Sequence, residues 1–214
     1  METVYLHGFA TSPSIWHAVL RKPAPIGSGR FPELSFGNIK EEAKRIGREL
    51  GEGIALIGWS MGGMIAIKIA ADFPKKIKSL VLVSTTPKFI GAPCGAPLAL
   101  LRRLEKRIKA EGAKAFHLLA FSREIEGLAH PSTEQALQEL KELEKIDLRK
   151  ELLKIKAATL IIHGNKDEIC LPAAAEYMRA KIRNSRLEIL SGVKHAPMFE
   201  APEVFSALIN NHVG

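Results

Sequence analysis

Cysteine is scarce in this chain of 214 residues, which contains only Cys94 and Cys170. The two are widely separated, and neither forms a C-x-x-C pair or lies beside a group of histidines. The sequence therefore excludes a disulfide-stapled scaffold and offers no zinc-ligand spacing. We expect both thiols to be reduced and structural, and Cys170 is close enough in sequence to Asp167 to line a site there.

Long hydrophobic runs are also missing. No apolar stretch reaches the roughly 20 residues that a membrane-spanning helix needs. Residues 3–6 have the pattern of a short strand instead of the apolar segment of a signal peptide. We therefore expect no membrane partner and, by default, a cytoplasmic location.

Acidic residues are outnumbered, because 31 Lys and Arg stand against 23 Asp and Glu, for a formal net charge of +8. Much of the excess lies between residues 88 and 123, which hold eight Lys or Arg and two Glu. A basic excess is typical of nucleic-acid binding, but the basic helix expected over about 96–111 has no interleaved aromatic residues and no nucleic-acid-binding motif surrounds it. We expect no nucleic-acid partner.

The remaining composition, with 46% apolar and 25% charged residues, is typical of a soluble globular domain. Strand patterns are found at 3–6, 54–57, 79–84, 159–163 and 187–190, and helical patterns at about 38–50, 63–73, 172–182 and 202–212. Their alternation predicts an α/β fold, in which helices flank both faces of a mostly parallel sheet. Further helical patterns fill residues 88–152. We therefore expect a core of residues 1–87 and 153–214 with a helical insertion over 88–152.

A serine between two glycines follows the second expected strand, in the segment Gly58-Trp59-Ser60-Met61-Gly62. A helical pattern begins directly afterwards, so the serine lies in a tight strand-to-helix turn. Side chains at the two glycine positions would collide with neighbouring backbone, while Ser60 would be held in a strained conformation with its hydroxyl presented to a substrate. The pattern predicts a nucleophile, and a plain glycine-rich turn is the alternative.

Two later loops carry the partners that a nucleophilic serine needs. Asp167 comes three residues after Gly164, at the end of the strand expected at 159–163. His195 lies in a loop of small residues after the strand expected at 187–190. Alone, a loop aspartate is usually a cap and a lone histidine is usually structural. Together, the chain order Ser60, Asp167, His195 predicts a catalytic triad.

An early loop, His7-Gly8-Phe9, follows the first expected strand directly. Beside a nucleophile elbow, such a loop supplies one backbone N–H to the oxyanion, and the residue after the nucleophile supplies the other. We therefore expect the amides of Phe9 and Met61 to form the oxyanion hole. The side chain of His7 is expected only to fix the loop by a local bond.

Further segments accompany these motifs along nearly the whole chain. They are Leu6-His7-Gly8-Phe9 with Trp16, Gly62-Gly63 after the elbow, Ser84-Thr85-Thr86-Pro87-Lys88-Phe89, Ile146-Asp147-Leu148-Arg149, Gly164-Asn165-Lys166-Asp167 with Pro172, and His195-Ala196-Pro197-Met198-Phe199. With them the chain resembles the α/β-hydrolase superfamily and, within it, the pimeloyl-acyl carrier protein methyl ester esterases of biotin synthesis.

The resemblance implies an α/β-hydrolase fold with the insertion at 88–152 as a lid over the nucleophile. It implies a serine carboxylesterase that works through an acyl-enzyme, without metal or organic cofactor, on a small-molecule or carrier-bound ester. Two departures are expected. The antiparallel hairpin that usually opens this fold is missing, and residues 22–35, rich in Pro and Gly, stand where the family usually has a strand ending in an acidic loop.

Candidate substrate contacts are Trp59 in the elbow and three apolar lid residues, Phe116, Leu119 and Phe121. Apolar lid side chains, Leu98 and Leu101 among them, line an acyl pocket on this interpretation, and the alternative is that they only bind the lid to the core.

One helix of the lid has a basic face. Over about 96–111, Leu98, Leu101, Leu104 and Ile108 share one side, and Arg102, Arg103, Lys106, Arg107 and Lys109 occupy the other. Such a face is usually only solvated. It also suits an acidic partner, and the resemblance names an acidic acyl carrier protein, which Arg102, Arg103, Lys106 and Arg107 would bind. A general short-chain carboxylesterase, a thioesterase and a non-catalytic ligand-binding protein stay open as alternatives.

Overall fold

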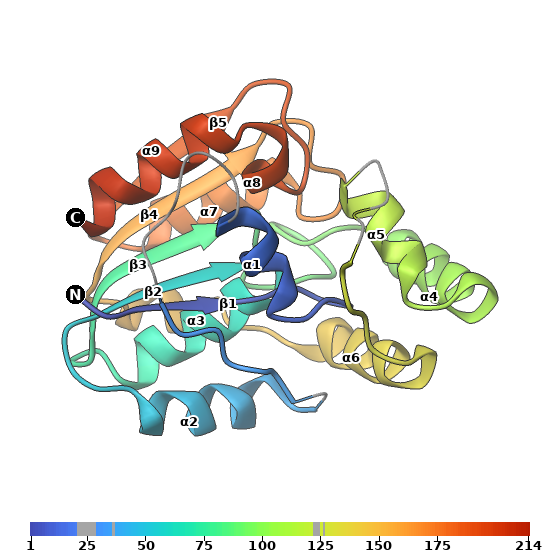
Figure 1. Cartoon of the computed structure of the whole chain (residues 1–214), viewed down its shortest axis with the longest axis horizontal. Helices are drawn as coiled ribbons and strands as arrows, with labels where there is room; N and C mark the ends of the chain where they lie inside the picture. Colours follow the sequence, from blue (N-terminus) through green and yellow to red (C-terminus); the bar gives the residue numbers. More distant parts are fainter. Residues whose placement is uncertain (21–28, 36, 122–124, 126) are drawn as a thin grey trace.

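The computed structural model describes residues 1–20, 29–35, 37–121, 125 and 127–214. Among these residues, five parallel strands form one sheet, namely β1 (Thr3–Leu6), β2 (Ile54–Trp59), β3 (Ile77–Val83), β4 (Ala158–Gly164) and β5 (Ser185–Leu190). They lie in the order β1-β2-β3-β4-β5, so strands that follow one another in the sequence are neighbours in the sheet (Figure 1). The α/β fold with a parallel sheet predicted from the sequence is confirmed.

The strands are short apolar runs because helices cover both faces of the sheet. All six residues of β2 are buried, and β3 and β4 each have a single exposed residue near the start. A strand buried on both faces has no polar side to alternate with, which is why continuous runs of Ile, Leu and Val predicted these positions within about two residues. The edge strand β5 is only half-buried, and its alternating pattern reflects that.

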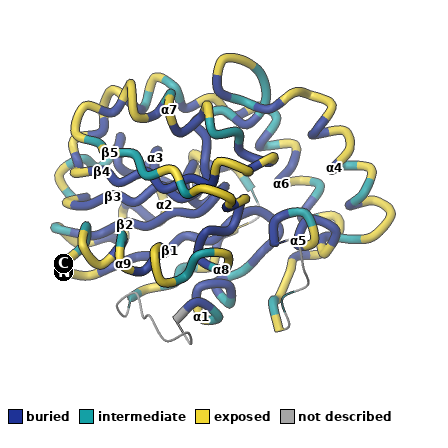
Figure 2. Tube along the Cα trace, turned by 90° about the horizontal axis from the view of Figure 1, so that it is seen from above, coloured by how far each residue is buried: buried dark blue, intermediate teal, exposed yellow. Residues whose placement is uncertain are grey.

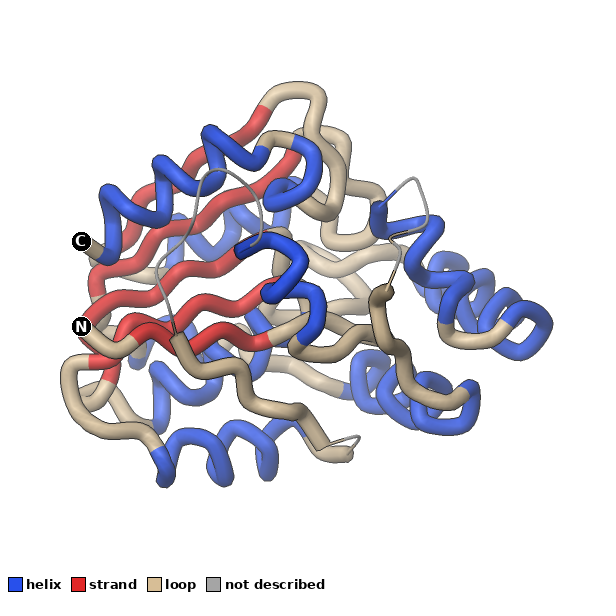
Figure 3. Tube along the Cα trace, viewed as in Figure 1, coloured by secondary structure: helices blue, strands red, loops and turns tan. Residues whose placement is uncertain are grey.

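Helices lie on both faces of the sheet (Figure 3). One layer contains α1 (Ser14–Leu20) and α9 (Pro202–Val213), and the other contains α3 (Met61–Asp72) and α7 (Pro172–Lys181), with α2 (Ile39–Glu49) packed against α3. Two short helices, α1 and α8 (Pro197–Glu200), were not expected from the sequence. Each helix is too short for its apolar residues to show a clear helical repeat in the sequence. The contribution of α1 to the core is visible only in the structure, where Ile15, Trp16 and Val19 are buried.

The segment predicted as a helical lid, residues 88–152 and called the lid below, contains α4 (Leu98–Glu111), α5 (Lys114–Phe121) and α6 (Thr133–Lys145), and η1 (Glu151–Lys154) leads from it back to the core. These α-helices gather beyond the carboxyl ends of the strands, at the opposite end of the molecule from the two termini (Figures 1 and 2). The helix expected over about 96–111 begins at Leu98, whose side chain is 47% exposed instead of sharing the buried face. Leu98 is the first residue of α4, so no earlier turn of the helix covers it.

The edge of the sheet beside β1 is reached by one residue of the Pro- and Gly-rich segment. Arg30 pairs with β1 in parallel, accepting from the Tyr5 N–H and donating to the Thr3 carbonyl, both at 2.9 Å. The sequence predicted that residues 22–35 differ from the strand and acidic loop usual in the family. Residues 22–28 of this segment lie outside the described residues, which resume at residue 29.

Within the described part of the chain, no helix combines the length and the apolar character needed to cross a membrane.

Candidate active site

Ser60 lies at the turn between β2 and α3, with φ of 55° and ψ of −121°. This left-handed backbone conformation is unfavourable for any residue with a side chain, so the surrounding contacts must hold it. The Ser60 N–H donates to the Val83 carbonyl at 3.0 Å, and the Thr85 hydroxyl donates to the Ser60 carbonyl at 2.6 Å. The end of β3 thus fixes the peptides on both sides of the serine.

Two glycines make the turn possible because each faces another stretch of backbone. A Cβ on Gly58 would collide with the backbone of Gly62 and Gly63, and a Cβ on Gly62 would collide with the carbonyl oxygens of Leu6 and His7. The second contact brings the start of α3 against the loop after β1.

His195 connects Ser60 to Asp167. Its Nδ1 lies 2.8 Å from Asp167 Oδ2, and its Nε2 lies 3.0 Å from Ser60 Oγ. Because a carboxylate can only accept, Nδ1 carries the hydrogen and Nε2 presents its lone pair to the Ser60 hydroxyl. The structure therefore brings together the three side chains that the sequence singled out, with the histidine in the tautomer that a general base requires.

The loops that carry Asp167 and His195 lie against each other. Gly164 ends β4, and a Cβ there would collide with the carbonyl oxygens of Val193 and Lys194. The Lys166 N–H donates to the Val193 carbonyl at 2.9 Å, and Asn165 Oδ1 accepts from the Gly192 N–H at 2.8 Å. Glycine at position 164 therefore permits the close approach that sets the distance between the acid and the base.

The Asp167 carboxylate is buried, and both of its oxygens accept hydrogen bonds. Its Oδ1 accepts from the N–H groups of Ile169 and Cys170 at 2.9 and 3.0 Å. Burial by itself raises the pKa of this carboxyl, but the electrostatic attraction of the adjacent His195 ring and the hydrogen bonds from His163 and His195 outweigh burial and hold the pKa well below its usual range. Asp167 is therefore ionised throughout the neutral range.

A second histidine, His163 of β4, reaches the same carboxylate. Its Nε2 donates to the Cys170 carbonyl at 2.6 Å and lies 3.3 Å from Asp167 Oδ2. Sequence reasoning assigned no role to His163, since it lies within a strand and not in a loop. Only its position on β4, four residues before Asp167, could have indicated the contact.

The two residues whose backbone N–H groups are expected to bind the oxyanion, Phe9 and Met61, line the same pocket as Ser60. Among the residues that the structure describes, neither the Phe9 nor the Met61 amide donates to another protein group. Met61 is the first residue of α3, where the helix leaves its N–H groups unsatisfied. Gly8 brings the early loop against the elbow, because a Cβ there would collide with the indole of Trp59. The local bond expected of His7 is present, from Nδ1 to the Gly8 carbonyl at 3.1 Å.

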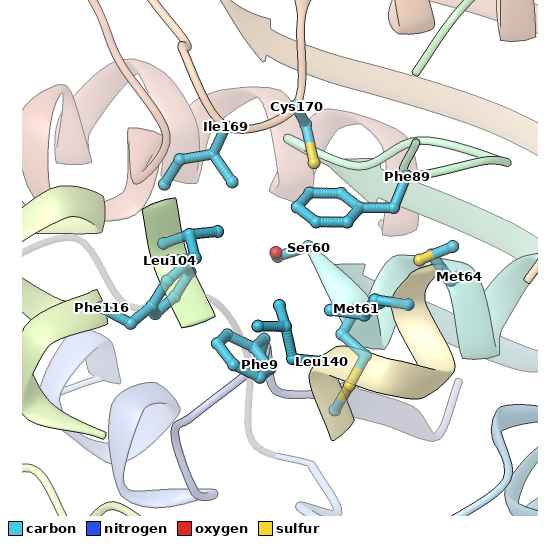
Figure 4. A pocket seen from close by; sticks show the side chains of 11 residues that line it. Phe9, Ser60, Met61, Met64, Phe89, Leu104, Phe116, Leu140, Ile169 and Cys170 are labelled. Atoms are coloured by element: carbon cyan, nitrogen blue, oxygen red, sulfur yellow. The ribbon is translucent and has the colours of Figure 1, made fainter. Parts of the chain in front are cut away.

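A small apolar pocket lies over the serine. Figure 4 shows the Ser60 hydroxyl surrounded by apolar side chains from the core and the lid. The lining residues are Phe9, Ser60, Met61, Met64, Phe89, Leu104, Phe116, Leu140, Leu143, Ile169 and Cys170. Ser60 itself is only 6% exposed, so its hydroxyl is shielded from bulk solvent. The lid covers it, and the hydroxyl faces the pocket instead.

Residues 3–208 match the family described as Alpha/beta hydrolase family. The chain belongs to the α/β hydrolase family.

Several curated relatives of this α/β hydrolase carry the name pimeloyl-acyl carrier protein methyl ester esterase. The protein of that name from Nitrosomonas europaea is 27% identical over 232 residues, which cover 95% of this chain and 92% of the relative. The one from Neisseria meningitidis serogroup B is 29% identical and covers 100% of this chain and 93% of its own length. The one from Aeromonas hydrophila is 27% identical, with coverage of 100% and 95%.

Solved structures resemble this α/β hydrolase over almost its full length. The esterase EaEST from Exiguobacterium antarcticum has a TM-score of 0.82 at 24% identity and covers 100% of this chain and 91% of its own. The enol-lactonase from Burkholderia xenovorans has a TM-score of 0.76 at 18% identity, with coverage of 99% and 90%. At such identities, the likeness shows the fold.

The predicted substrate contacts of this α/β hydrolase are placed differently from one another. Phe116 lines the pocket over Ser60, with its ring against Phe9 at a centroid distance of 4.9 Å. Leu119 lies outside that pocket, in a surface hollow beside His195. Trp59 and Phe121 stack on each other at 5.7 Å and are not among the lining residues. Trp59 points away from the pocket because it ends β2 with its side chain toward the His195 loop.

The four predicted carrier contacts divide into two pairs. Arg102 is ion-paired with Glu105 and Glu144 at 3.2 Å each, and Arg107 with Glu111 at 3.1 Å. Arg103 and Lys106 are exposed, and neither makes an ion pair with any residue that the structure describes. The unpaired charge of the basic face is therefore concentrated on Arg103 and Lys106.

Several lining residues were missed by sequence reasoning. Leu140 and Leu143 come from α6, and Met64 and Phe89 come from α3 and the loop after β3. Phe89 lies in one of the segments that carried the resemblance, whereas the α6 residues have no motif and follow only the helical period of an apolar stripe. The same stripe contains Glu139, a buried carboxyl that its charge alone would have excluded.

Proposed function

We propose that this α/β hydrolase is a serine carboxylesterase that hydrolyses an ester through an acyl-enzyme. The single observation that supports it best is the continuous chain of hydrogen bonds from Asp167 through His195 to Ser60, ending at the floor of an apolar pocket. A binding protein has no need of a buried carboxylate that selects one histidine tautomer and directs it at a strained serine.

Each residue has a defined step in this mechanism. His195 Nε2 takes the Ser60 proton as Oγ attacks the ester carbonyl carbon, and Asp167 stabilises the imidazolium that forms. The imidazolium then protonates the departing alkoxide, which leaves as the alcohol. A water molecule, deprotonated by His195, hydrolyses the acyl-enzyme and restores the serine hydroxyl.

The amides of Phe9 and Met61 are proposed to stabilise the oxyanion of each tetrahedral intermediate. Their lack of an acceptor among the described residues supports this role, since both N–H groups are available when the charge develops. Removing one such donor typically costs about 3 kcal/mol of transition-state stabilisation. No metal or organic cofactor enters these steps.

For the substrate, we propose the methyl ester of pimeloyl-acyl carrier protein. The curated relatives carry that activity in their name. None of the described residues that line the pocket carries a charge, which suits an acyl chain whose ends are an ester and a thioester and disfavours one with a free carboxylate. Arg102, Arg103, Lys106 and Arg107 would meet the acidic carrier at the outer face of α4, with Arg103 and Lys106 supplying the unpaired charge.

A second candidate is a general short-chain carboxylesterase, favoured by the small size of the pocket over Ser60. The deciding experiment compares hydrolysis of methyl pimeloyl-carrier protein with a series of p-nitrophenyl esters of increasing acyl length. Strong preference for the carrier substrate supports the first candidate, and activity only on acetyl or butyryl esters supports the second. Faster hydrolysis of the carrier thioester than of its methyl ester would identify a thioesterase.

A matched pair of serine variants tests the nucleophile. Ser60→Ala should abolish hydrolysis of every ester and prevent labelling by a fluorophosphonate, without lowering the melting temperature. The control is Ser79→Ala, which removes the buried hydroxyl of a serine on β3 and should leave labelling and activity intact. Activity of Ser60→Ala within tenfold of the wild type contradicts the assignment, and absence of labelling in the wild-type protein would indicate a non-catalytic ligand-binding role.

A further inference from the structure

Two helices of the lid, α5 and α6, form hydrogen bonds to the backbone N–H and carbonyl groups of Ala10 in the early loop. The Ala10 N–H donates to Glu139 Oε2 of α6 at 3.2 Å, and His117 Nε2 of α5 donates to the Ala10 carbonyl at 2.8 Å. Because a carbonyl oxygen can only accept, Nε2 of His117 carries the hydrogen. Glu139 and His117 are 3% and 4% exposed, so both bonds are shielded from water.

Ala10 has a backbone that depends on such support. Its φ is 54°, in the left-handed region that a residue with a Cβ adopts only under constraint. It directly follows Phe9, whose N–H is the proposed oxyanion donor and whose ring lies edge-on against Phe116 of α5. Release of Ala10 toward a more ordinary φ would change the path of the chain at Phe9.

Packing does not explain why a carboxyl group occupies this position. Glu139 lies on the apolar stripe of α6, between Ala136 and Leu140, where a leucine would bury more apolar surface. Burial raises the pKa of Glu139 to about 7, while the hydrogen bond from the Ala10 N–H acts in the opposite direction. Within the described part of the chain, this buried group, which is costly to ionise, makes its hydrogen bond to the early loop.

We propose that Glu139 and His117 are positioning residues that hold Ala10 so that the Phe9 N–H is directed at the oxyanion above Ser60. The lid thereby completes the oxyanion hole of the core, in addition to covering the pocket. This inference rests on the proposed esterase function, since it concerns the same site. Neither side chain needs to touch the substrate.

Two pairs of variants test the proposal on the whole chain. Glu139→Leu removes the acceptor at nearly constant volume, and Glu139→Gln keeps an acceptor oxygen. His117→Leu removes the donor, and His117→Gln keeps an N–H donor. Glu134→Leu, at an exposed position of the same helix, is the matched control. The measurements are kcat and KM for p-nitrophenyl butyrate and inhibition by a trifluoromethyl ketone, which forms an oxyanion on the serine.

We expect each leucine variant to lose about tenfold in kcat with KM within about twofold, and to bind the ketone correspondingly less tightly. Each glutamine variant should recover a large part of the loss, and Glu134→Leu should match the wild type. Wild-type kcat and ketone affinity in the leucine variants would overturn the proposal. So would glutamine variants no better than the leucine ones, because a purely structural role requires only the volume.

Amide hydrogen exchange at Ala10, followed by NMR, separates this proposal from the proposed function. If the wild-type protein hydrolyses no ester, the esterase assignment fails, and exchange still tests the bond itself. Slow exchange in the wild type and Glu139→Gln with fast exchange in Glu139→Leu supports it, and equal exchange in all three overturns it. Should Glu139→Leu fail to fold, the His117 pair and Glu139→Gln decide.

Discussion

The indole N–H of Trp59 donates a hydrogen bond to the carbonyl oxygen of His195 at 2.8 Å, although 136 positions separate the two residues. The same indole packs against the imidazole, with ring centroids 5.4 Å apart. Trp59 directly precedes the proposed nucleophile, so one side chain joins the elbow to the loop that carries the proposed base. The position of His195 relative to Ser60 is therefore set partly from beneath the site, independently of Asp167.

Trp59→Phe should lower kcat on small esters about tenfold with little change in KM, because the His195 carbonyl loses its donor and the loop is free to shift. The free energy of unfolding should fall by about 1–3 kcal/mol, the usual cost of leaving a buried polar group unpaired. Steady-state kinetics and urea denaturation measure the two effects. Trp16→Phe is the matched control, because the buried Trp16 Nε1 has no hydrogen-bond partner among the described residues. Equal kinetic losses in both variants would show that the indole volume matters and the bond does not.

Asp167→Asn and His195→Ala should each lower kcat by at least about a thousandfold, since members of a triad act as one unit. In the asparagine variant, the amide can donate to His195 Nδ1 and so favours the wrong tautomer. Single-turnover kinetics with a p-nitrophenyl ester measure the loss. Asp72→Asn, which breaks the ion pair with Lys68 on α3, should be silent. A nearly silent Asp167→Asn would mean that another group orients His195.

Reversing the two unpaired charges of α4, with Arg103→Glu and Lys106→Glu together, should raise KM for the carrier-bound ester severalfold and leave small esters unaffected. Exposed charges act on encounter and docking, and not on bond-making. The effect should shrink as salt rises, since the Debye length at physiological ionic strength is about 8 Å. The matched control is Lys75→Glu with Lys78→Glu, two exposed residues at the opposite end of the sheet. Similar losses on both substrates would indicate a displaced lid instead of a docking surface.

Glu139 should make stability depend on pH in a defined window. Its folded pKa of about 7 exceeds the ordinary 4.5, so its contribution is fully present below about 4.5 and is lost as pH rises to about 7. His7 acts in the opposite direction, because burial lowers its pKa from 6.5 to about 4 and its contribution is lost as pH falls through that range. The difference between the wild type and Glu139→Gln isolates the carboxyl.

As pH rises across the window, the wild type should lose on the order of 3 kcal/mol of its free energy of unfolding relative to Glu139→Gln. Urea denaturation at a series of pH values measures it. A difference that is flat from pH 4.5 to above 7 would contradict the burial of an ionisable carboxyl at this position.

Strands β2 and β4 were predictable because each is a short apolar run that ends at a recognisable turn. Ile54–Trp59 is buried on both faces and stops at a serine held between glycines, and Ala158–Gly164 stops at a glycine followed by an acid. Helices that begin with a capping residue were predictable in the same way. In α2, the side chain of Asn38 accepts hydrogen bonds from the N–H groups of Lys40 and Glu41. In contrast, α1 has no such signal over its seven residues.

The sequence alone determined the α/β fold and the identity of Ser60, Asp167 and His195 as candidates, because local patterns mark the ends of parallel strands and the residues directly after them. Only the tertiary structure decided which side chains surround the serine. Trp59 lies beneath the site and Leu140 lines it, although nothing in the neighbouring sequence distinguishes the two roles. The contacts of Ala10 with Glu139 and His117 join residues more than 100 positions apart. Such contacts depend on how the lid helices pack over the sheet, and no local period or motif encodes that arrangement.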